Sequence, residues 1–395
     1  MSIQDCKQDM LRIGVDVGST TVKLLVLDPD DQIVFSVYRR HHSDVRATIV
    51  EIIDEALEAV GDGKATITIT GSGGLLLANW LGVPFVQEVI ANKTAIERII
   101  PATDVAIELG GEDAKIIYFD GGIEQRMNGT CAGGTGAFID QMAALLNTDA
   151  SGLDEMAKEH NIIYPIASRC GVFAKTDVQP LLNEGAKRED IAASIFQAVV
   201  MQTISGLACG RPIRGNVAFL GGPLHYLPQL RQRFIETLEL TDETTIIPEE
   251  SHLFVARGAA FASEANDDIV SLAELKERMR NLGSIQGSEV QRLEPLFANE
   301  REYEAFRKRH AKATVPKASL ADYRGVAYLG IDAGSTTLKS VLVGEKGEIL
   351  YGYYVNNKGD VLGAARAMLG DLASQIPCDA DGNPLVTIGH TTTTG

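Results

Sequence analysis

The chain has 395 residues, of which 45% are hydrophobic and 23% charged, and its net charge is −17. This composition supports a folded protein of two or three domains, and the negative charge argues against nucleic acid as a partner, because phosphate backbones need basic surface. No run of eighteen apolar residues occurs, and no basic or apolar leader follows Met1. We therefore expect no membrane span, no secretory signal and a cytoplasmic location.

The first elements alternate between strands and helices. Alternating apolar residues over 12–27, on both sides of Gly18, predict two strands joined by a tight turn. Helical apolar spacing over 46–60 ends at Gly61, a normal helix stop. Further strands are predicted at 65–70, 105–109 and 114–119. Strands that alternate with helices indicate an α/β fold.

The middle of the chain continues this pattern and then changes. We predict a long helix at 191–209, a strand at 216–220 and a helix at 227–238. Residues 265–325 are rich in Glu, Lys and Arg and poor in β-branched residues. This segment is predicted to be a charged helical connector between modules.

One motif occurs twice. The sequence IGVDVGSTTVK at 13–23 returns as LGIDAGSTTLK at 329–339. The predicted domains are a first module at 1–264, the connector at 265–325 and an incomplete second module at 326–395.

The last residues resemble a strand of the first module. Residues 386–395 are similar to 66–71, the strand and glycine turn that follow the first helix. We expect the chain to stop within a domain, as a fragment of a longer protein, since a strand edge would otherwise be left unpaired. A natural C-terminus is the alternative.

Three glycine-rich turns follow strands in the first module. They contain Asp16 and Gly18, then Gly110 and Gly111, then Gly221 and Gly222. A single turn of this kind fits a plain hairpin. Three in this order, the first two with acidic neighbours, are similar to the two phosphate loops and the adenosine loop of the sugar kinase, chaperone and actin superfamily. No G-x-x-x-x-G-K-[ST] motif occurs, which disfavours a P-loop enzyme.

The residue types suggest how ATP or ADP would be bound. Backbone amides and hydroxyls of Ser19, Thr20 and Thr21 are expected at the β- and γ-phosphates. Lys23 is interpreted as a charge near the phosphates or a solvent-facing cation. Asp16 and Asp113 are hard oxygen donors suited to water-mediated Mg²⁺. Either one, or Glu112, is a candidate to orient the hydrolytic water, while Gly221 and Gly222 leave room for adenosine.

Two cysteines lie in glycine-rich segments ahead of helical patterns. Cys131 occurs in TCAGGTG and Cys170 in RCGVF. A thiolate at a helix N-terminus has a lowered pKa and binds metal readily, and small neighbours let an inorganic cluster approach the backbone. Two such thiolates make half of a four-thiolate iron–sulfur site. A homodimer would supply the other half across its two-fold axis.

The other interpretations of the cysteines are plainer. Free cysteines are often buried small apolar residues, and a zinc site is disfavoured because no C-x-x-C pair occurs. Cys209 is interpreted as structural, and Cys6 and Cys378 as bystanders.

Together these motifs resemble the ATP-dependent activators of 2-hydroxyacyl-CoA dehydratases and the related ATPase subunits of benzoyl-CoA reductases. The resemblance covers about residues 11–263 and restarts at 326. The residues that match the motifs are Asp16, Gly18, Ser19, Thr20, Lys23, Gly110, Gly111, Asp113, Gly221, Gly222, Cys131 and Cys170. The implied fold is the sugar kinase, chaperone and actin-like (ribonuclease H-like) one, with duplicated subdomains followed by the start of a second such module.

The resemblance also implies an activity. Such proteins hydrolyse ATP, accept an electron from a ferredoxin or flavodoxin, and pass it at low potential to a partner iron–sulfur enzyme such as a 2-hydroxyacyl-CoA dehydratase. In that family the two cysteine motifs hold one 4Fe-4S cluster shared by a homodimer. The second module matches only the first phosphate loop, and we expect that it does not bind ATP.

The second loop departs from the family pattern. Glu108 and Glu112 stand where the family usually has Asp and Gln. The extra acidity is expected to alter the magnesium geometry and to slow or redirect hydrolysis. Two other functions stay open: a small-molecule kinase on the same fold, with Asp113 as base and no cluster, and a non-catalytic regulatory protein in which ATP only sets the conformation.

Overall fold

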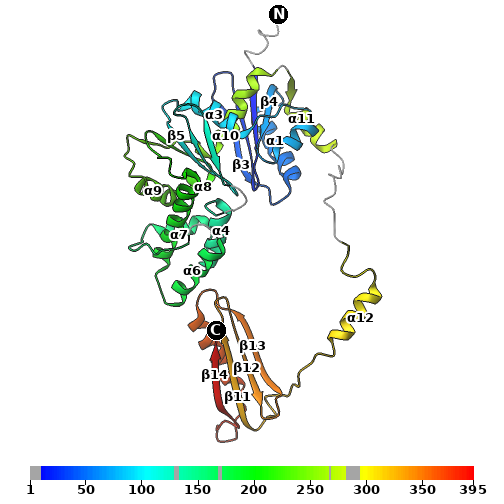
Figure 1. Ribbon diagram of the computed structural model, residues 1–395. Coiled ribbons are helices and arrows are strands. Elements are labelled where there is room, and N and C mark those ends of the chain that lie inside the picture. Colours follow the sequence, from blue (N-terminus) through cyan, green and yellow to red (C-terminus); the bar gives the residue numbers. More distant parts are fainter. Residues whose placement is uncertain (1–9, 129–132, 168–170, 267, 282–293) are drawn as a thin grey trace, which may run out of the picture. The chain divides into compact units, whose positions relative to one another are not determined.

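Three sheets built on the same strand order dominate the computed structural model (Figure 1). The structure describes residues 10–128, 133–167, 171–266, 268–281 and 294–395. The chain divides into two units: one comprises Met1–Ala144, Thr148–Asp177 and Lys187–Ile285, and the other is mainly Gln286–Gly395.

The first sheet has the order β10-β4-β1-β2-β3. Its strands are β1 (Leu11–Val17), β2 (Thr21–Leu27), β3 (Ile33–Arg40), β4 (Lys64–Thr70) and β10 (Ile269–Ser271). The helices α1 (Val45–Val60), α2 (Gly74–Leu81) and α11 (Leu272–Asn281) belong to the same subdomain. β1 pairs parallel with β4, and the remaining pairs are antiparallel.

β1, β2 and β4 are buried on both faces, whereas the edge strand β3 is partly exposed. Val22 and Leu24 pack with α1 residues such as Ile52 in one cluster. Leu25 packs in another cluster with α10 (Phe254–Ala262). A side chain at Gly14 would overlap the backbone of α10, so glycine allows that helix to lie directly on β1.

The second sheet repeats the pattern in the order β7-β6-β5-β8-β9. Its strands are β5 (Val105–Leu109), β6 (Ala114–Tyr118), β7 (Glu124–Met127), β8 (Val217–Leu220) and β9 (Thr245–Ile246). β5 pairs antiparallel with β6 and parallel with β8, as β1 does with β2 and β4. These are the duplicated subdomains of the predicted α/β fold.

Helices precede and connect the strands of the second sheet. They are α3 (Glu88–Ile99), α4 (Gly136–Leu145), α5 (Ala150–Ala157), α6 (Gly171–Asn183), α7 (Arg188–Thr203), a π-helix (Ile204–Ala208), α8 (Gly222–Tyr226), α9 (Pro228–Thr237) and a short 3-10 turn at Ser251–Leu253. A further 3-10 turn, Ser263–Ala265, follows α10 and lies against β1 and β4 of the first sheet. The helix predicted at 191–209 is thus α7 with a π-helical last turn.

In the described part of the chain, one helical stretch, Arg188–Ala208, is apolar and long enough to cross a membrane. Its most apolar window is 67% buried within the protein. Core helices of soluble proteins pass the same test, so this is weak evidence for a span.

The second unit contains a third sheet of the same design. Its strands are β11 (Gly325–Ala333), β12 (Thr337–Gly344), β13 (Ile349–Asn356) and β14 (Val386–Thr394), with α13 (Val361–Gln375) after β13. The order β13-β12-β11-β14 and the parallel β11–β14 pair match β3-β2-β1-β4 of the first sheet. The sequence repeat is therefore a repeat in structure.

The segment predicted as a connector differs in part from that prediction. Residues 269–281 form β10, which pairs with β4, and α11, whose Leu272, Leu275 and Met279 lie in the core of the first sheet. Helix α12 (Glu300–His310) has no buried residue and fits the prediction of a charged helix. The high charge of α11 hid its apolar face, which consists of few residues at helical spacing.

Candidate functional site

The first phosphate loop is the turn between β1 and β2. Gly18 N–H donates to Thr21 O at 2.9 Å and closes the turn. Asp16 and Lys23 face each other in the strand register, and Lys23 Nζ lies 2.6 Å from Asp16 Oδ2. Asp16 is 2% exposed, and its Oδ1 has no hydrogen-bond partner in the described structure. Burial opposes the charge of Lys23, but Asp16 and Tyr38 outweigh it and raise the pKa of Lys23.

The second phosphate loop joins β5 to β6 and touches the first. Gly110 N–H donates to Asp113 O at 2.7 Å. A side chain at Gly111 would overlap Thr20 Oγ1, so glycine at this position brings the two loops together. Glu112 is exposed at the tip of this loop.

A buried lysine that sequence reasoning missed holds the acidic residues behind this loop. Lys115 is 3% exposed, and its Nζ lies 2.5 Å from Glu88, 2.6 Å from Asp113 and 3.7 Å from Glu108. Asn92 Nδ2 donates to the other oxygen of Glu108 at 2.7 Å. The signal was available: Lys115 is a charged residue inside the otherwise apolar strand β6, directly opposite Glu108.

The charges of this cluster are strongly perturbed. Burial raises the pKa of Glu108 to about 7, because Glu88 and Asp113 add to desolvation and Lys115 only partly compensates. The three carboxylates raise the pKa of Lys115 against the opposing effect of burial. Lys115 is therefore charged at neutral pH, while Glu108 is poised between its two forms.

The third loop leads from β8 into α8. Gly221 has φ of 90° and its N–H donates to Ser251 O at 3.0 Å. A side chain at Gly222 would overlap the hydroxyl of Tyr38. The rings of Tyr38 and Tyr226 have centroids 5.6 Å apart, so an aromatic surface borders this loop.

The three loops line neighbouring cavities within the first unit. Thr20, Thr21, Gly111 and Gly222 line an open cavity of ≈ 730 Å³. A neighbouring cavity of ≈ 330 Å³ is lined by Lys23, Glu108, Gly110 and Gly221. The two cavities share four lining residues: Thr21, Tyr38, Gly111 and Gly222. The structure thus brings seven of the predicted binding residues to these cavities: Thr20, Thr21, Lys23, Gly110, Gly111, Gly221 and Gly222. The linings do not include Gly18, Ser19, Asp16, Glu112 or Asp113; Asp16 is held by Lys23 and Asp113 by Lys115.

The second phosphate loop is bonded to the helix that follows the first cysteine motif. Gly136 N–H donates to Gly110 O at 3.0 Å, and Ala137 N–H donates to Gly111 O at 2.7 Å. These are first-turn amides of α4, which have no acceptor within the helix itself. Backbone bonds therefore fix the start of α4 to the loop.

The predicted cluster ligands lie outside the described residues. Cys131 falls in the gap at 129–132, and Cys170 in the gap at 168–170, directly before α6 begins at Gly171. Cys209, interpreted as structural, is instead exposed, because it follows the π-helical turn in a left-handed conformation.

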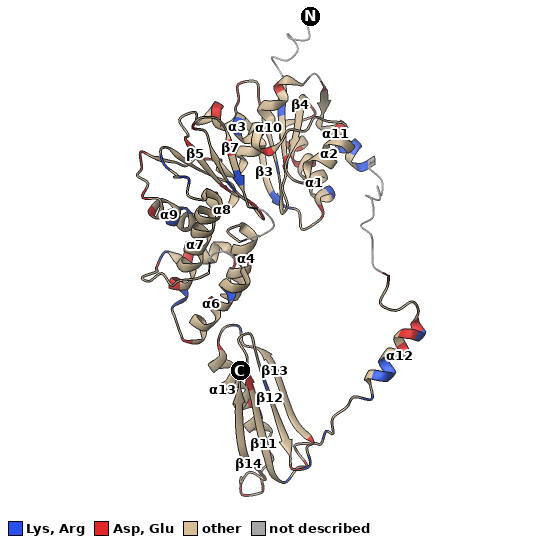
Figure 2. Cartoon of the chain, viewed as in Figure 1, with Lys and Arg blue, Asp and Glu red and all other residues tan. Residues whose placement is uncertain are grey.

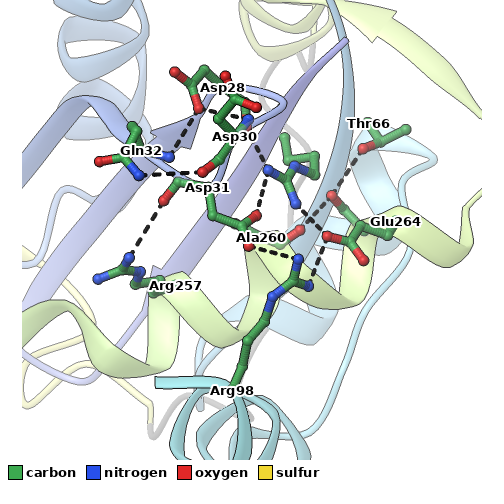
Figure 3. Close-up of polar contacts among 11 residues, drawn as sticks. Asp28, Asp30, Asp31, Gln32, Thr66, Arg98, Arg257, Ala260 and Glu264 are labelled. Carbon is green, nitrogen blue, oxygen red and sulfur yellow. Dashed lines mark hydrogen bonds and ion pairs between the residues drawn. The ribbon is translucent and has the colours of Figure 1, made fainter. Parts of the chain in front are cut away.

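A polar network ties β1, the β2–β3 turn, α3 and the end of α10 together (Figure 3). Arg12 pairs with Asp31 at 2.6 Å and also with Glu264. Arg98 of α3 reaches the same two carboxylates, at 2.7 and 2.8 Å. Because α3 also packs against the second sheet through Ala95 and Ile96, this network lies where the two subdomains join.

The sequence profile of one family, described as the BadF/BadG/BcrA/BcrD ATPase family, matches residues 13–262. The chain belongs to this family. It is therefore an ATPase by family, with the actin-like and sugar kinase-like α/β fold that was predicted.

Relatives of this ATPase include proteins named as activators. This chain is 29% identical over 218 residues to the 2-hydroxyisocaproyl-CoA dehydratase activator of Clostridioides difficile, and the match covers 54% of this chain and 81% of the relative. It is 31% identical over 215 residues to the (R)-2-hydroxyglutaryl-CoA dehydratase activating ATPase of Acidaminococcus fermentans, covering 53% and 82%. The predicted family is thereby confirmed.

Solved structures of such activators share the fold of this ATPase. Component A of the Acidaminococcus fermentans (R)-2-hydroxyglutaryl-CoA dehydratase matches with a TM-score of 0.57 at 27% identity, over 65% of this chain and 99% of that one. The 2-hydroxyisocaproyl-CoA dehydratase activator from Clostridium difficile with bound ADPNP matches with a TM-score of 0.58 at 27% identity, over 70% and 100%.

Proposed function

We propose that this ATPase activates a 2-hydroxyacyl-CoA dehydratase or a similar iron–sulfur enzyme, using ATP hydrolysis to deliver low-potential electrons from a ferredoxin or flavodoxin. The relatives named as dehydratase activators support this proposal. A 4Fe-4S cluster, when bound by Cys131 and Cys170 of two subunits, would supply the one-electron chemistry. The homodimer and a cytoplasmic location are parts of the same proposal.

The residues of the cleft are assigned the following roles. The amides and hydroxyls of Ser19, Thr20 and Thr21 bind the β- and γ-phosphates with Lys23, and Gly221 and Gly222 make room for adenosine. Asp16 Oδ1, a buried acceptor without a partner in the described structure, fits a water of a magnesium ion. Asp113 and Glu112 remain candidates to orient the hydrolytic water, and release of Asp113 from Lys115 would be required for that role.

The observation that carries the proposal is the pair of backbone bonds between the second phosphate loop and α4. A displacement of Gly110 or Gly111 between nucleotide states would be passed directly to Gly136 and Ala137. Cys131 lies five residues before that helix start. Nucleotide hydrolysis would thereby alter the surroundings of the predicted cluster ligand, provided that ATP interacts differently with the two states.

Anaerobic purification with iron and sulfide analysis tests the proposal. We expect one 4Fe-4S cluster per dimer, with an absorption band near ~400 nm that dithionite bleaches. Cys131→Ser and Cys170→Ser should each lose the cluster, whereas Cys209→Ser, which alters an exposed thiol with no predicted role, should keep it. Protein without iron after anaerobic reconstitution would overturn the redox function and favour a small-molecule kinase.

We also propose the module division at 1–264, 265–325 and 326–395, with β10 and α11 added to the first module on the strength of their packing. The second unit reproduces the first phosphate loop: Lys339 Nζ lies 2.8 Å from Asp332 Oδ2. Among its described residues no counterpart of the second or third loop is present. We therefore expect that this unit does not bind ATP on its own.

A further inference from the structure

The cavity lined by Thr20 and Gly222 has two chemically different kinds of lining. Thr20, Thr21 and Gly111 offer hydroxyls and backbone amides. The rest of the wall is mainly apolar or aromatic, with Ile139, Ala150, Pro223, Tyr226 and Leu227. A ligand with a charged end and a flat apolar end suits such a cavity. A nucleotide also has a polar sugar between these ends, which needs a partner of its own.

Asp140 is the sole carboxylate among the described residues that line this cavity. It lies four residues after Gly136, the residue whose N–H is bonded to the phosphate loop. One helical turn, ~6 Å along the axis, therefore separates Asp140 from the loop-bound end of α4. A carboxylate at this distance from the loop can meet a group that lies next to the phosphates of a bound nucleotide.

Asp140 is also oriented from the opposite side of the cleft. Arg40, the last residue of β3, pairs in the strand register with Thr21 of the first phosphate loop. Its Nη1 lies 2.8 Å from Asp140 Oδ2. A carboxylate has about four acceptor positions on its two oxygens, and this side chain is 37% exposed. Arg40 thus fixes Asp140 while leaving acceptor positions available.

We propose that Asp140 accepts hydrogen bonds from the 2′- and 3′-hydroxyls of the nucleotide ribose, and that Arg40 orients its carboxylate. This assignment rests on the proposed function, because it needs an adenine nucleotide in the cleft. It makes Asp140 a binding residue that selects ribonucleotides by their diol. No other carboxylate in the described wall of the cavity competes for this role.

Calorimetric titration of the full chain with ADP and with 2′,3′-dideoxy-ADP tests the proposal. The natural protein should bind dideoxy-ADP about tenfold or more weakly than ADP, since hydrogen bonds to a charged acceptor are lost. Asp140→Asn should weaken ADP binding by a similar factor and leave dideoxy-ADP binding nearly unchanged. The comparison of ligands on the natural protein requires no variant to fold.

Arg40→Gln is the matched control, because it removes the same ion pair but keeps the carboxylate. It should retain most of the discrimination between the two ligands. The proposal is overturned if the natural protein binds both ligands equally, or if Asp140→Asn weakens both alike, as loss of a bridge across the cleft would do. Failure to bind any adenine nucleotide would overturn this assignment together with the proposed function, whereas equal binding of both ligands would leave that function intact.

Discussion

Lys115 sets the charge balance behind the nucleotide cleft. One ammonium group, itself buried, faces three carboxylates, those of Glu88, Glu108 and Asp113. One positive charge cannot neutralise three negative ones, so one carboxyl retains its proton more readily. Glu108 is the most buried of the three and the one whose pKa is raised to about 7.

This raised pKa predicts a pH dependence of stability. Between pH 4.5 and about 7 the unfolded chain has lost the proton of Glu108 while the folded chain retains it. The free energy of unfolding therefore falls as pH rises through this window, by up to about 3 kcal/mol from this group. Glu108→Gln should flatten the fall. Urea unfolding at several pH values would measure it, with the exposed Glu97→Gln as control.

If the stability of Glu108→Gln changes with pH as that of the natural protein does, Glu108 is not the source of the pH dependence.

The sequence pointed to acidic residues in the second phosphate loop but not to their arrangement. The second loop was recognisable from Gly110 and Gly111, because glycine has a specific use in tight turns. The pairing of Asp113 with Lys115 was not, since it depends on which side chains the folded loop turns inward.

At the scale of elements, the network around Arg12 joins parts of the chain that are far apart in sequence. The β2–β3 turn supplies Asp31, and the turn after α10 supplies Glu264. Arg98 binds the same carboxylates and stacks on Phe261, with its guanidinium carbon 4.3 Å from the ring centroid. The two arginines differ in exposure, at 9% and 39% of the side chain.

This difference predicts unequal costs of substitution. Arg12→Met should lower the free energy of unfolding by about 2 kcal/mol, because the buried guanidinium of Arg12 makes ion pairs that water screens little and also donates to Asp28 O. Arg98→Met should cost about 1 kcal/mol, since the exposed guanidinium of Arg98 is screened by water. Chemical denaturation of both variants compares them directly. Equal costs would show that the network is no more stable at its buried end than at its exposed end.

Helix α12 is stabilised by its own ends, since it has no buried face. Asn299 Oδ1 accepts from Glu302 N–H at 3.2 Å, and Glu302 Oε2 accepts from Ala298 N–H at 2.9 Å. Asn299 is thus the N-cap, and Glu302 reaches back to the residue before it. Acidic residues occupy the first turn and basic residues the last, as Figure 2 shows, an arrangement that favours the helix dipole.

Removal of the cap should therefore loosen α12. Asn299→Ala is expected to destabilise the helix by about 1 kcal/mol, which would speed amide hydrogen exchange across Glu300–His310. Glu304→Ala, a change at an exposed position within the helix, serves as control and should have little effect. Unchanged exchange in Asn299→Ala would show that the helix does not depend on its N-cap.

At the scale of the whole molecule, one strand pattern is used three times. Two of the three copies share the sequence motif around Asp16 and Asp332, so this repeat could be predicted from the sequence alone. The copy built on β5 shares no such motif, so only its alternation of strands and helices was predictable. The short strand β10 was missed because three residues carry too little periodicity.

The repeated loop provides a comparison within one chain. Lys23 is 16% exposed and its partner Asp16 2%, whereas Lys339 is 39% exposed and Asp332 42%. Amine-reactive labelling followed by mass spectrometry should therefore modify Lys339 several-fold faster than Lys23. Exposed Lys346 supplies the reference rate. Equal labelling of Lys23 and Lys339 would contradict the difference in burial.

The bonds from α4 to the second phosphate loop have an evolutionary consequence. Donors and acceptors are all main-chain atoms, so a side-chain replacement at Ala137 does not delete them, whereas Gly110 and Gly111 leave no room for a side chain. Proline at position 136 or 137 would delete one of these hydrogen bonds, because proline lacks the backbone N–H. A sequence change at a neighbouring position such as Glu108 or Glu112 can thus alter the side chains around the loop while the backbone linkage between loop and helix is kept.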